Sequence, residues 1–267
     1  MVAYHKERSF SAAYDPGFTD QALMNELTAA YKEADIVIAE TPAYGLSVLD
    51  PDPQVREEKI QSIIRQLQRA ESIGALCAVM HGGTVRPGRW GQHSPENFGK
   101  EAVDATVKAI RRILDTVRPK KSKLVIETES RVLPDGPDIY LEIIKAVDHP
   151  GLGAHLDPVN ITLSPRRYYF SGAFIRECFE KIGSYVVSCH AKDTMMMRHS
   201  QVRFDETFAG NGELDYKAYI TELASLDQDA PIMIEHCNER QMGWAARFII
   251  DQADELGISM RGGTASP

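Results

Sequence analysis

The chain has 267 residues, enough for one large α/β domain, and no linker-like stretch divides it, so we expect a single domain over 1–267. Its 30 Lys and Arg against 38 Asp and Glu give a net charge of −8 without a basic stripe, which argues against nucleic-acid binding. The N-terminus lacks a signal-peptide core, no apolar run reaches membrane-spanning length and the cysteines are scattered; we expect a cytoplasmic protein without membrane contact.

The predicted elements alternate between helices and short apolar strands. Helices are predicted at 20–34, 53–73, 103–117, 137–147, 172–183, 215–226 and 241–255. Strands are predicted at 35–40, 75–81, 123–128, 152–156, 185–190 and 231–235. Two further segments, 82–95 and 193–212, are predicted to be long loops.

This alternation indicates βαβ units, and therefore a parallel barrel or a doubly wound sheet. A complete eight-stranded barrel needs more strands than these six, and residues 1–19 have room for one at most. The barrel therefore either opens with an irregular strand around 2–5 or lacks its first βα unit. An incomplete barrel exposes a sheet edge that another chain or the N-terminal arm must cover, so we expect a homo-oligomer, a dimer or tetramer.

Four potential metal ligands stand at the ends of apolar runs. They are Glu127 in LVIET, Asp157 in GAHLD, His190 in YVVSCH and Glu235 in PIMIE. Taken singly, each has an ordinary explanation, such as a solvated strand end, an Asp-Pro turn or a core histidine. Because parallel barrels gather the C-terminal ends of their strands at one mouth, the four together predict one mononuclear metal site.

One imidazole with three carboxylates is a hard, oxygen-rich donor set. Such a set suits Mn²⁺ or Mg²⁺, with Co²⁺ or Zn²⁺ as alternatives. The sequence therefore predicts an enzyme that depends on a divalent cation.

Several polar residues near these strand ends are candidate contacts for a small polar substrate. His81 ends its strand before two glycines, which would let substrate or backbone approach closely. Trp90 and His93 follow in the next loop and could form a wall over the ligand. Asn160 and Lys192 are placed to hydrogen-bond ligand oxygens.

These motifs, in this order, resemble the sugar phosphate isomerase/epimerase family, the xylose isomerase-like TIM barrels. The resemblance covers roughly residues 35–255. Its most specific pieces are GAHLDPVN (153–160), SCHAKD (188–193), GNGELDY (210–216) and PIMIEH (231–236).

The resemblance implies an α/β fold of the xylose isomerase-like (β/α) barrel type, irregular or incomplete at its N-terminal strands. It also implies that Glu127, Asp157, His190 and Glu235 hold one divalent cation, usually Mn²⁺. In the ketose epimerases of this family, the glutamates matching Glu127 and Glu235 also move the substrate proton through an enediolate.

One departure from the epimerase pattern bears on the reaction. The epimerases carry a His three residues after the metal-binding Asp, whereas this chain has Asn160. We therefore expect a metal-dependent isomerase or epimerase of a small sugar or polyhydroxy ketone, with two alternatives. The first is a lyase that eliminates water or a glycosidic group on the same scaffold, and the second is a non-catalytic subunit of an assembly.

Overall fold

The structure is a computed structural model that describes residues 2–3, 11–14, 21–86, 93–198 and 201–262. The chain divides into two compact units, which are described separately below. Unit 1 comprises residues 1–13 and 156–267, and unit 2 comprises residues 14–155. The prediction of a single domain over 1–267 stays a prediction. No helix among the described residues is long and apolar enough to cross a membrane.

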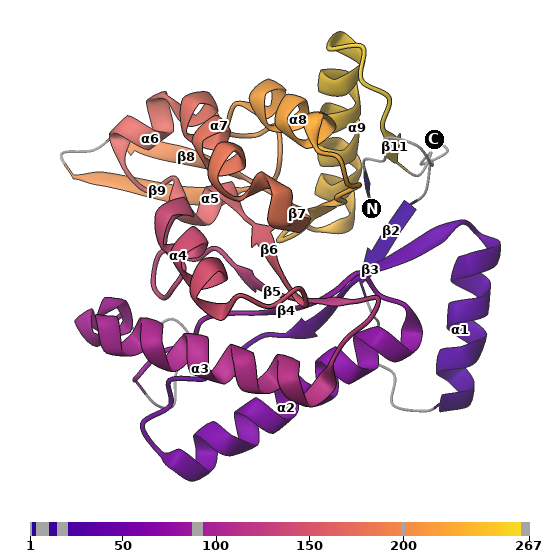
Figure 1. The fold of residues 1–267 in the computed structure, drawn as a ribbon. Coiled ribbons are helices and arrows are strands. Elements are labelled where there is room, and N and C mark those ends of the chain that lie inside the picture. The colour runs from indigo at the N-terminus through magenta and orange to yellow at the C-terminus, as the bar shows by residue number, and fades with distance from the viewer. Residues whose placement is uncertain (1, 4–10, 15–20, 87–92, 199–200, 263–267) are drawn as a thin grey trace. The chain divides into compact units, whose positions relative to one another are not determined.

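Unit 2 is built on parallel strands in the order β3-β4-β5-β6 (Figure 1). Each begins within a residue or two of its predicted start, because short, nearly continuous apolar runs are typical of parallel strands that are covered on both faces. The strands are β3 (Ile36–Ala43), β4 (Cys77–Met80), β5 (Lys123–Glu127) and β6 (Leu152–Leu156).

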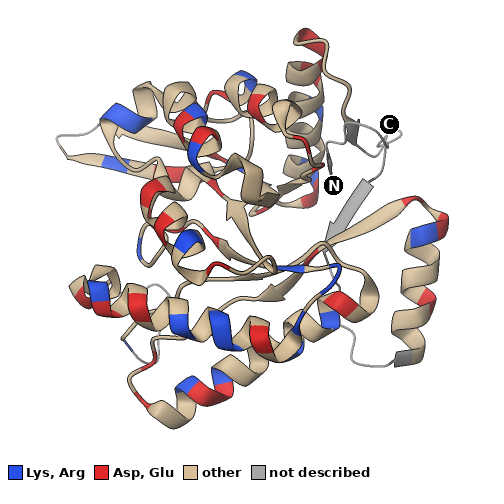
Figure 2. Ribbon diagram, viewed as in Figure 1, with Lys and Arg blue, Asp and Glu red and all other residues tan. Residues whose placement is uncertain are grey.

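Helices precede β3 or connect the strands, and all of them except the short 3-10 helix were predicted. They are α1 (Gln21–Glu33), α2 (Pro53–Ile73), the short 3-10 helix η1 (Pro95–Phe98), α3 (Lys100–Val117) and α4 (Pro137–Val147). Asp52 caps the N-terminus of α2 by accepting from two backbone N–H groups, and Gly74 ends the helix at φ 73°. The helix lies against β3 and β4 (Figure 1), and Ile60, Ile63, Ile64 and Leu67 on it are buried. Lys, Arg, Asp and Glu lie interspersed along α2 and α3 (Figure 2).

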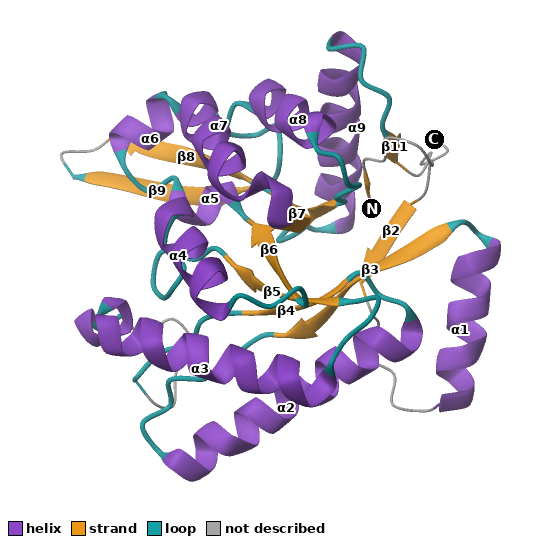
Figure 3. Ribbon diagram, viewed as in Figure 1, coloured by secondary structure: helices purple, strands orange, loops and turns teal. Residues whose placement is uncertain are grey.

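Unit 1 contains the parallel pair β7 and β10, together with several helices (Figure 3). The strands are β7 (Val186–Ala191) and β10 (Ile232–Ile234). The helices are α5 (Pro158–Ile161), α6 (Pro165–Tyr169), α7 (Ser171–Ile182), the 3-10 helix η2 (Gly183–Tyr185), α8 (Tyr216–Ser225) and α9 (Glu239–Glu255).

Two antiparallel pairs of strands in unit 1 were not predicted as pairs, although an irregular strand around 2–5 was one of the two expectations for the N-terminus. Residues 193–212 are not one long loop, because β8 (Asp193–Arg198) and β9 (Val202–Thr207) form a hairpin within them. At the N-terminus, β1 (Val2–Ala3) pairs with β11 (Arg261–Gly262). A further strand, β2, spans Ser11–Tyr14.

Candidate metal and active site

The four predicted metal ligands stand where the sequence predicts, at the C-terminal ends of strands. Glu127 is the last residue of β5, and Asp157 directly follows β6. His190 is the next-to-last residue of β7, and Glu235 directly follows β10. Asp157, His190 and Glu235 belong to unit 1, whereas Glu127 belongs to unit 2, so its place in the ligand set remains a prediction.

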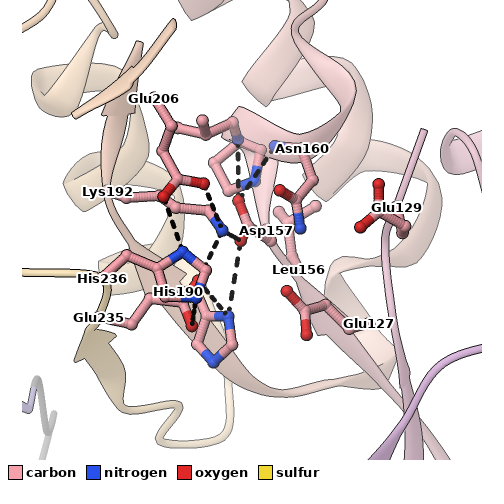
Figure 4. A network of polar contacts seen from close by, with 12 residues as sticks. Glu127, Glu129, Leu156, Asp157, Asn160, His190, Lys192, Glu206, Glu235 and His236 are labelled. Carbon is pink, nitrogen blue, oxygen red and sulfur yellow. Dashed lines mark hydrogen bonds and ion pairs between the residues drawn. The ribbon is translucent and has the colours of Figure 1, made fainter. Parts of the chain in front are cut away.

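In unit 1, three of these side chains converge. His190 Nδ1 lies 3.0 Å from Glu235 Oε1 and 3.5 Å from Asp157 Oδ2 (Figure 4). One potential ligand atom from each residue lies within 4.8 Å of the other two. Asp157 and His190 are almost fully buried, and the Glu235 side chain is 15% exposed. Atoms at these separations can bind one ion with ligand distances of about 2.0–2.4 Å.

Asp157 has two roles, one for each carboxylate oxygen. Its Oδ1 caps the short helix α5 by accepting from Val159 N at 3.0 Å and Asn160 N at 3.2 Å. The Asp157-Pro158 pair thus also begins a helical turn, the ordinary role considered for it in the sequence. This cap fixes the carboxylate so that Oδ2 faces His190 and Lys192.

Lys192 is the buried cation of this cluster, with a side chain only 2% exposed. Its Nζ lies 2.6 Å from Glu235 Oε1, 2.9 Å from Asp157 Oδ2 and 3.1 Å from Glu206 Oε2 (Figure 4). Lys192 was predicted as a substrate contact. Its observed partners are the carboxylates of the candidate site, so any substrate contact would have to share this ammonium with them.

Glu206 and His236 complete the cluster and were missed in the sequence. His236 Nδ1 donates to Glu206 Oε1 at 2.7 Å, and this hydrogen bond raises the pKa of His236. Burial alone would raise the pKa of Glu206, but His236 and the Lys192 ammonium hold it below its usual value. His236 also has φ 52°, a left-handed conformation that is uncommon outside glycine and recurs at functional sites.

In unit 2, Glu127 pairs with a predicted substrate contact. Glu127 Oε2 lies 3.0 Å from His81 Nε2, and both side chains are less than a tenth exposed. The Tyr44 ring packs on the His81 ring at a centroid distance of 4.9 Å. The two glycines after His81 allow backbone rather than substrate to approach, because a Cβ on Gly82 would lie 1.9 Å from the Leu133 carbonyl oxygen.

Unit 2 contains two further polar pairs, one just after β5 and one between β3 and β6. Glu129 accepts two hydrogen bonds from the Arg131 guanidinium, which neutralises this second strand-end glutamate. Glu40 Oε1 lies 3.2 Å from His155 Nε2, and both side chains are fully buried. The alternation of strand residues could have drawn attention to His155, since it shares a face with Asp157.

The remaining predicted substrate contacts have different outcomes. Asn160 lies in α5 next to the cluster, with its backbone N–H bound to Asp157. His93 is exposed. Trp90 lies outside the described residues, and its role stays a prediction.

The GNGELDY motif supports the backbone beside Lys192. Asp193 Oδ1 accepts from Thr194 N at 2.8 Å and Leu214 N at 2.9 Å, and its Oδ2 accepts from Gly210 N at 3.1 Å. Burial raises the pKa of Asp193 despite these hydrogen bonds. The closely spaced glycines therefore surround a carboxylate of the chain itself, which explains the motif without a bound phosphate.

The donor set of unit 1 fits a divalent cation. Asp157 and Glu235 are carboxylates at low exposure whose charge requires a cationic partner, and Lys192 already supplies one positive charge there. An imidazole and two carboxylates are ligands that Mn²⁺, Mg²⁺ and Zn²⁺ accept.

Comparison with known proteins bears on the fold of this chain. A family model described as a xylose isomerase-like TIM barrel matches residues 4–256. No curated protein matches the sequence.

Solved structures of similar fold were also found. A xylose isomerase-like TIM barrel protein from Mycobacterium smegmatis, in complex with magnesium, has a TM-score of 0.68 and 16% identity, covering 92% of this chain and 84% of that one. D-psicose 3-epimerase from Clostridium cellulolyticum H10 has a TM-score of 0.65 and 14% identity, with coverages of 90% and 85%. The probable 3-DHS dehydratase AsbF from Bacillus anthracis has a TM-score of 0.62 and 17% identity, with coverages of 87% and 82%. At these identities the likeness shows the fold alone.

Proposed function

Because the chain belongs to the xylose isomerase-like TIM barrel family, we propose that it is a metal-dependent isomerase or epimerase of a small sugar or polyhydroxy ketone. Family membership confirms the predicted (β/α)-barrel fold class. The observation that carries the functional proposal is the convergence of Asp157, His190 and Glu235 in unit 1.

In the proposed site these three residues and Glu127 hold one divalent cation, with Mn²⁺ preferred over Mg²⁺, Co²⁺ or Zn²⁺. When bound, the ion supplies Lewis-acid polarisation of adjacent carbonyl and hydroxyl oxygens of the substrate. Glu127 and Glu235 act as the acid/base pair. One carboxylate removes the proton from the carbon next to the carbonyl, and the other returns a proton to the opposite face.

Lys192 and His81 support this chemistry through their glutamate partners. The Lys192 ammonium, 2.6 Å from Glu235 Oε1, holds the Glu235 carboxylate in place. The His81 imidazole at 3.0 Å orients the Glu127 carboxylate. Both residues, with Asn160, can also hydrogen-bond substrate hydroxyl groups.

A lyase is the second candidate, and two observations favour it. Asn160 stands where the epimerases of the family carry a His, so a residue of the epimerase pattern is missing. The Lys192 ammonium lies beside the proposed base Glu235, where it can protonate a departing hydroxyl or glycosidic oxygen. Proton abstraction would then be followed by loss of the β-substituent rather than by reprotonation.

The reaction can be tested by incubating Mn²⁺-loaded protein in D₂O with a panel of ketoses and keto-glycosides. Deuterium incorporation next to the carbonyl without elimination supports the isomerase or epimerase. Elimination products support the lyase. The absence of exchange and elimination across a broad panel would contradict both and favour a non-catalytic subunit.

A matched pair of histidine variants tests the metal site separately. His190→Ala removes a proposed ligand, so the stoichiometric Mn²⁺ of the wild type should be lost. His149→Ala removes the half-buried His149, which accepts from Gly151 N, and should retain the metal. Full metal retention by His190→Ala would contradict the ligand assignment.

We also propose that the protein works in a reducing compartment such as the cytoplasm. The thiols of Cys77, Cys178 and Cys189 are buried in the core, and Cys237 is partly exposed. Buried thiols of this kind act as small apolar side chains.

A further inference from the structure

Three fully buried tyrosines come from crossover helices and direct their hydroxyls at strand-end backbone. In unit 1, the Tyr219 hydroxyl of α8 lies 3.0 Å from the His190 carbonyl oxygen and 3.3 Å from the Leu156 carbonyl oxygen. His190 is a proposed ligand, and Leu156 directly precedes another, Asp157. One turn earlier, the Tyr216 hydroxyl donates to the Lys192 carbonyl oxygen at 2.8 Å.

The same arrangement occurs independently in unit 2. The Tyr140 hydroxyl of α4 accepts from Ile126 N and from His155 N, each at 3.0 Å, and it donates to the Ile126 carbonyl oxygen. Ile126 directly precedes Glu127, and His155 is the register partner of Glu127 across β5 and β6. One hydroxyl thus connects two adjacent strands at the point where the proposed acid/base residue projects.

Filling the core does not require these hydroxyls, because phenylalanine occupies nearly the same space without a polar atom. A buried hydroxyl costs free energy unless it is hydrogen-bonded, so its presence calls for specific partners.

We propose that Tyr140 and Tyr219 are positioning residues, whose hydroxyls fix the backbone from which Glu127, Asp157 and His190 project into the active site. The inference rests on the proposed function, since it assigns these three residues to the metal and the proton transfer. Neither tyrosine is proposed to touch metal or substrate. Each acts through the strand end that it holds, as an outer-shell partner holds a ligand side chain.

The test compares two variants that lose only a hydroxyl, Tyr219→Phe and Tyr140→Phe, with the control Tyr168→Phe. Tyr168 is also a buried tyrosine of unit 1, but its hydroxyl contacts the backbone of Met196 in the β8–β9 hairpin and Glu213. Two quantities are measured for each protein, and kcat and KM are measured in addition for Tyr140→Phe. The first is the Kd for Mn²⁺, measured by titration calorimetry. The second is the backbone hydrogen exchange of the metal-free protein, measured in the peptides that contain the strand ends.

Tyr219→Phe should weaken Mn²⁺ binding by about 10- to 100-fold, the usual cost of losing an outer-shell partner. Exchange should accelerate in peptides spanning 155–160 and 188–193. Tyr140→Phe should accelerate exchange at 124–129 and lower kcat more than it raises KM. Tyr168→Phe should leave the Mn²⁺ Kd and all of these peptides unchanged.

The inference is overturned if both site variants keep wild-type exchange at the strand ends and a wild-type Mn²⁺ Kd, even if their melting temperatures fall. That result would mean that the hydroxyls contribute to stability alone. A wild-type protein that binds no Mn²⁺ would instead contradict the proposed function. Exchange of the metal-free strand ends would then still decide whether the two hydroxyls position them.

Discussion

Lys192 Nζ lies 2.6 Å from Glu235 Oε1, inside the group of side chains proposed to bind the metal. A buried ammonium at this place offsets the repulsion between Asp157 and Glu235 when no ion is bound. It also adds positive charge beside the bound ion, which opposes tight binding. Lys192 therefore couples the stability of the metal-free protein to its affinity for metal.

Replacing the cation with a neutral side chain of similar length tests this coupling. Lys192→Met should destabilise the metal-free protein by about 3–5 kcal/mol, because buried carboxylates lose their partner. Mn²⁺ should then raise the melting temperature of the variant more than that of the wild type. Differential scanning fluorimetry with and without Mn²⁺ measures both effects.

Lys59→Met is the matched control, since Lys59 Nζ pairs with the buried Asp50 Oδ2 at 2.7 Å on an unrelated loop. Its melting temperature should fall without a larger gain from Mn²⁺. Equal Mn²⁺ gains in wild type and Lys192→Met would show that Lys192 does not oppose the ion.

Replacing either of the two proposed acid/base glutamates by glutamine should have the same effect on activity. Glu127→Gln and Glu235→Gln each keep one oxygen donor but remove the base, so kcat should fall by about 10²- to 10⁴-fold. Metal content, measured by mass spectrometry, should fall much less. Glu129→Gln, a change at the neighbouring strand-end glutamate held by Arg131, should retain most activity. Wild-type turnover by both Gln variants would refute the proton-transfer role.

The parts of the site that lie on regular βα units could be predicted from sequence. Asp157, His190 and Glu235 stand directly at the ends of apolar runs, and parallel strands bring such ends together. The cluster residue Glu206, which lies outside the regular βα units, could not be predicted. Glu206 lies on β9, whose sequence VRFDET is largely polar and half exposed, so no apolar periodicity marks it as a strand.

Contacts between residues far apart in sequence could not be predicted from the sequence either. Tyr140 and Tyr219 fit their helices as ordinary apolar-face residues, and only the tertiary structure shows which backbone atoms their hydroxyls meet. His155 is similar, because its partner Glu40 lies on another strand. A side chain's residue type predicts the need for a hydrogen bond but not the identity of its partner.

We propose that the protein is a homo-oligomer, most simply a dimer, and that exposed side chains around α6 contribute to the contact. Leu163, Tyr169 and Phe170 are 45%, 59% and 66% exposed within one short segment of unit 1, and clustered apolar exposure favours association. Sedimentation equilibrium at micromolar concentration should give a mass above 29.7 kDa. Phe170→Asp should lower it, whereas Tyr185→Asp, a change at another exposed aromatic, should not. A wild-type monomer would contradict the proposal.

The Glu57–Arg112 pair between α2 and α3 predicts a pH dependence outside the site. Two hydrogen bonds of 2.5 and 2.6 Å from Arg112 lower the pKa of Glu57 from 4.5 to about 2. Because the folded-state pKa is lowered, the pair stabilises the fold above about pH 4.5 and loses this effect as the pH falls toward 2. Arg112→Met should return the pKa of Glu57 toward 4.5, measured by carboxyl carbon NMR. An unchanged titration curve would contradict the assigned cause.

Two glycine-to-alanine changes should shift stability in opposite directions. A Cβ on Gly212 would lie 2.3 Å from Asp193 Oδ1 and 2.5 Å from the Thr194 carbonyl oxygen, and neither the buried carboxylate nor the backbone can withdraw cheaply. Gly212→Ala should therefore destabilise the protein by about 1–3 kcal/mol. A Cβ on Gly243 in α9 would meet no atom within 4 Å, so Gly243→Ala should stabilise by about 0.5–1 kcal/mol. Urea unfolding of both variants measures the difference. If Gly212→Ala were neutral, the loop would be able to move away from Asp193, and the carboxylate would not fix the backbone beside Lys192.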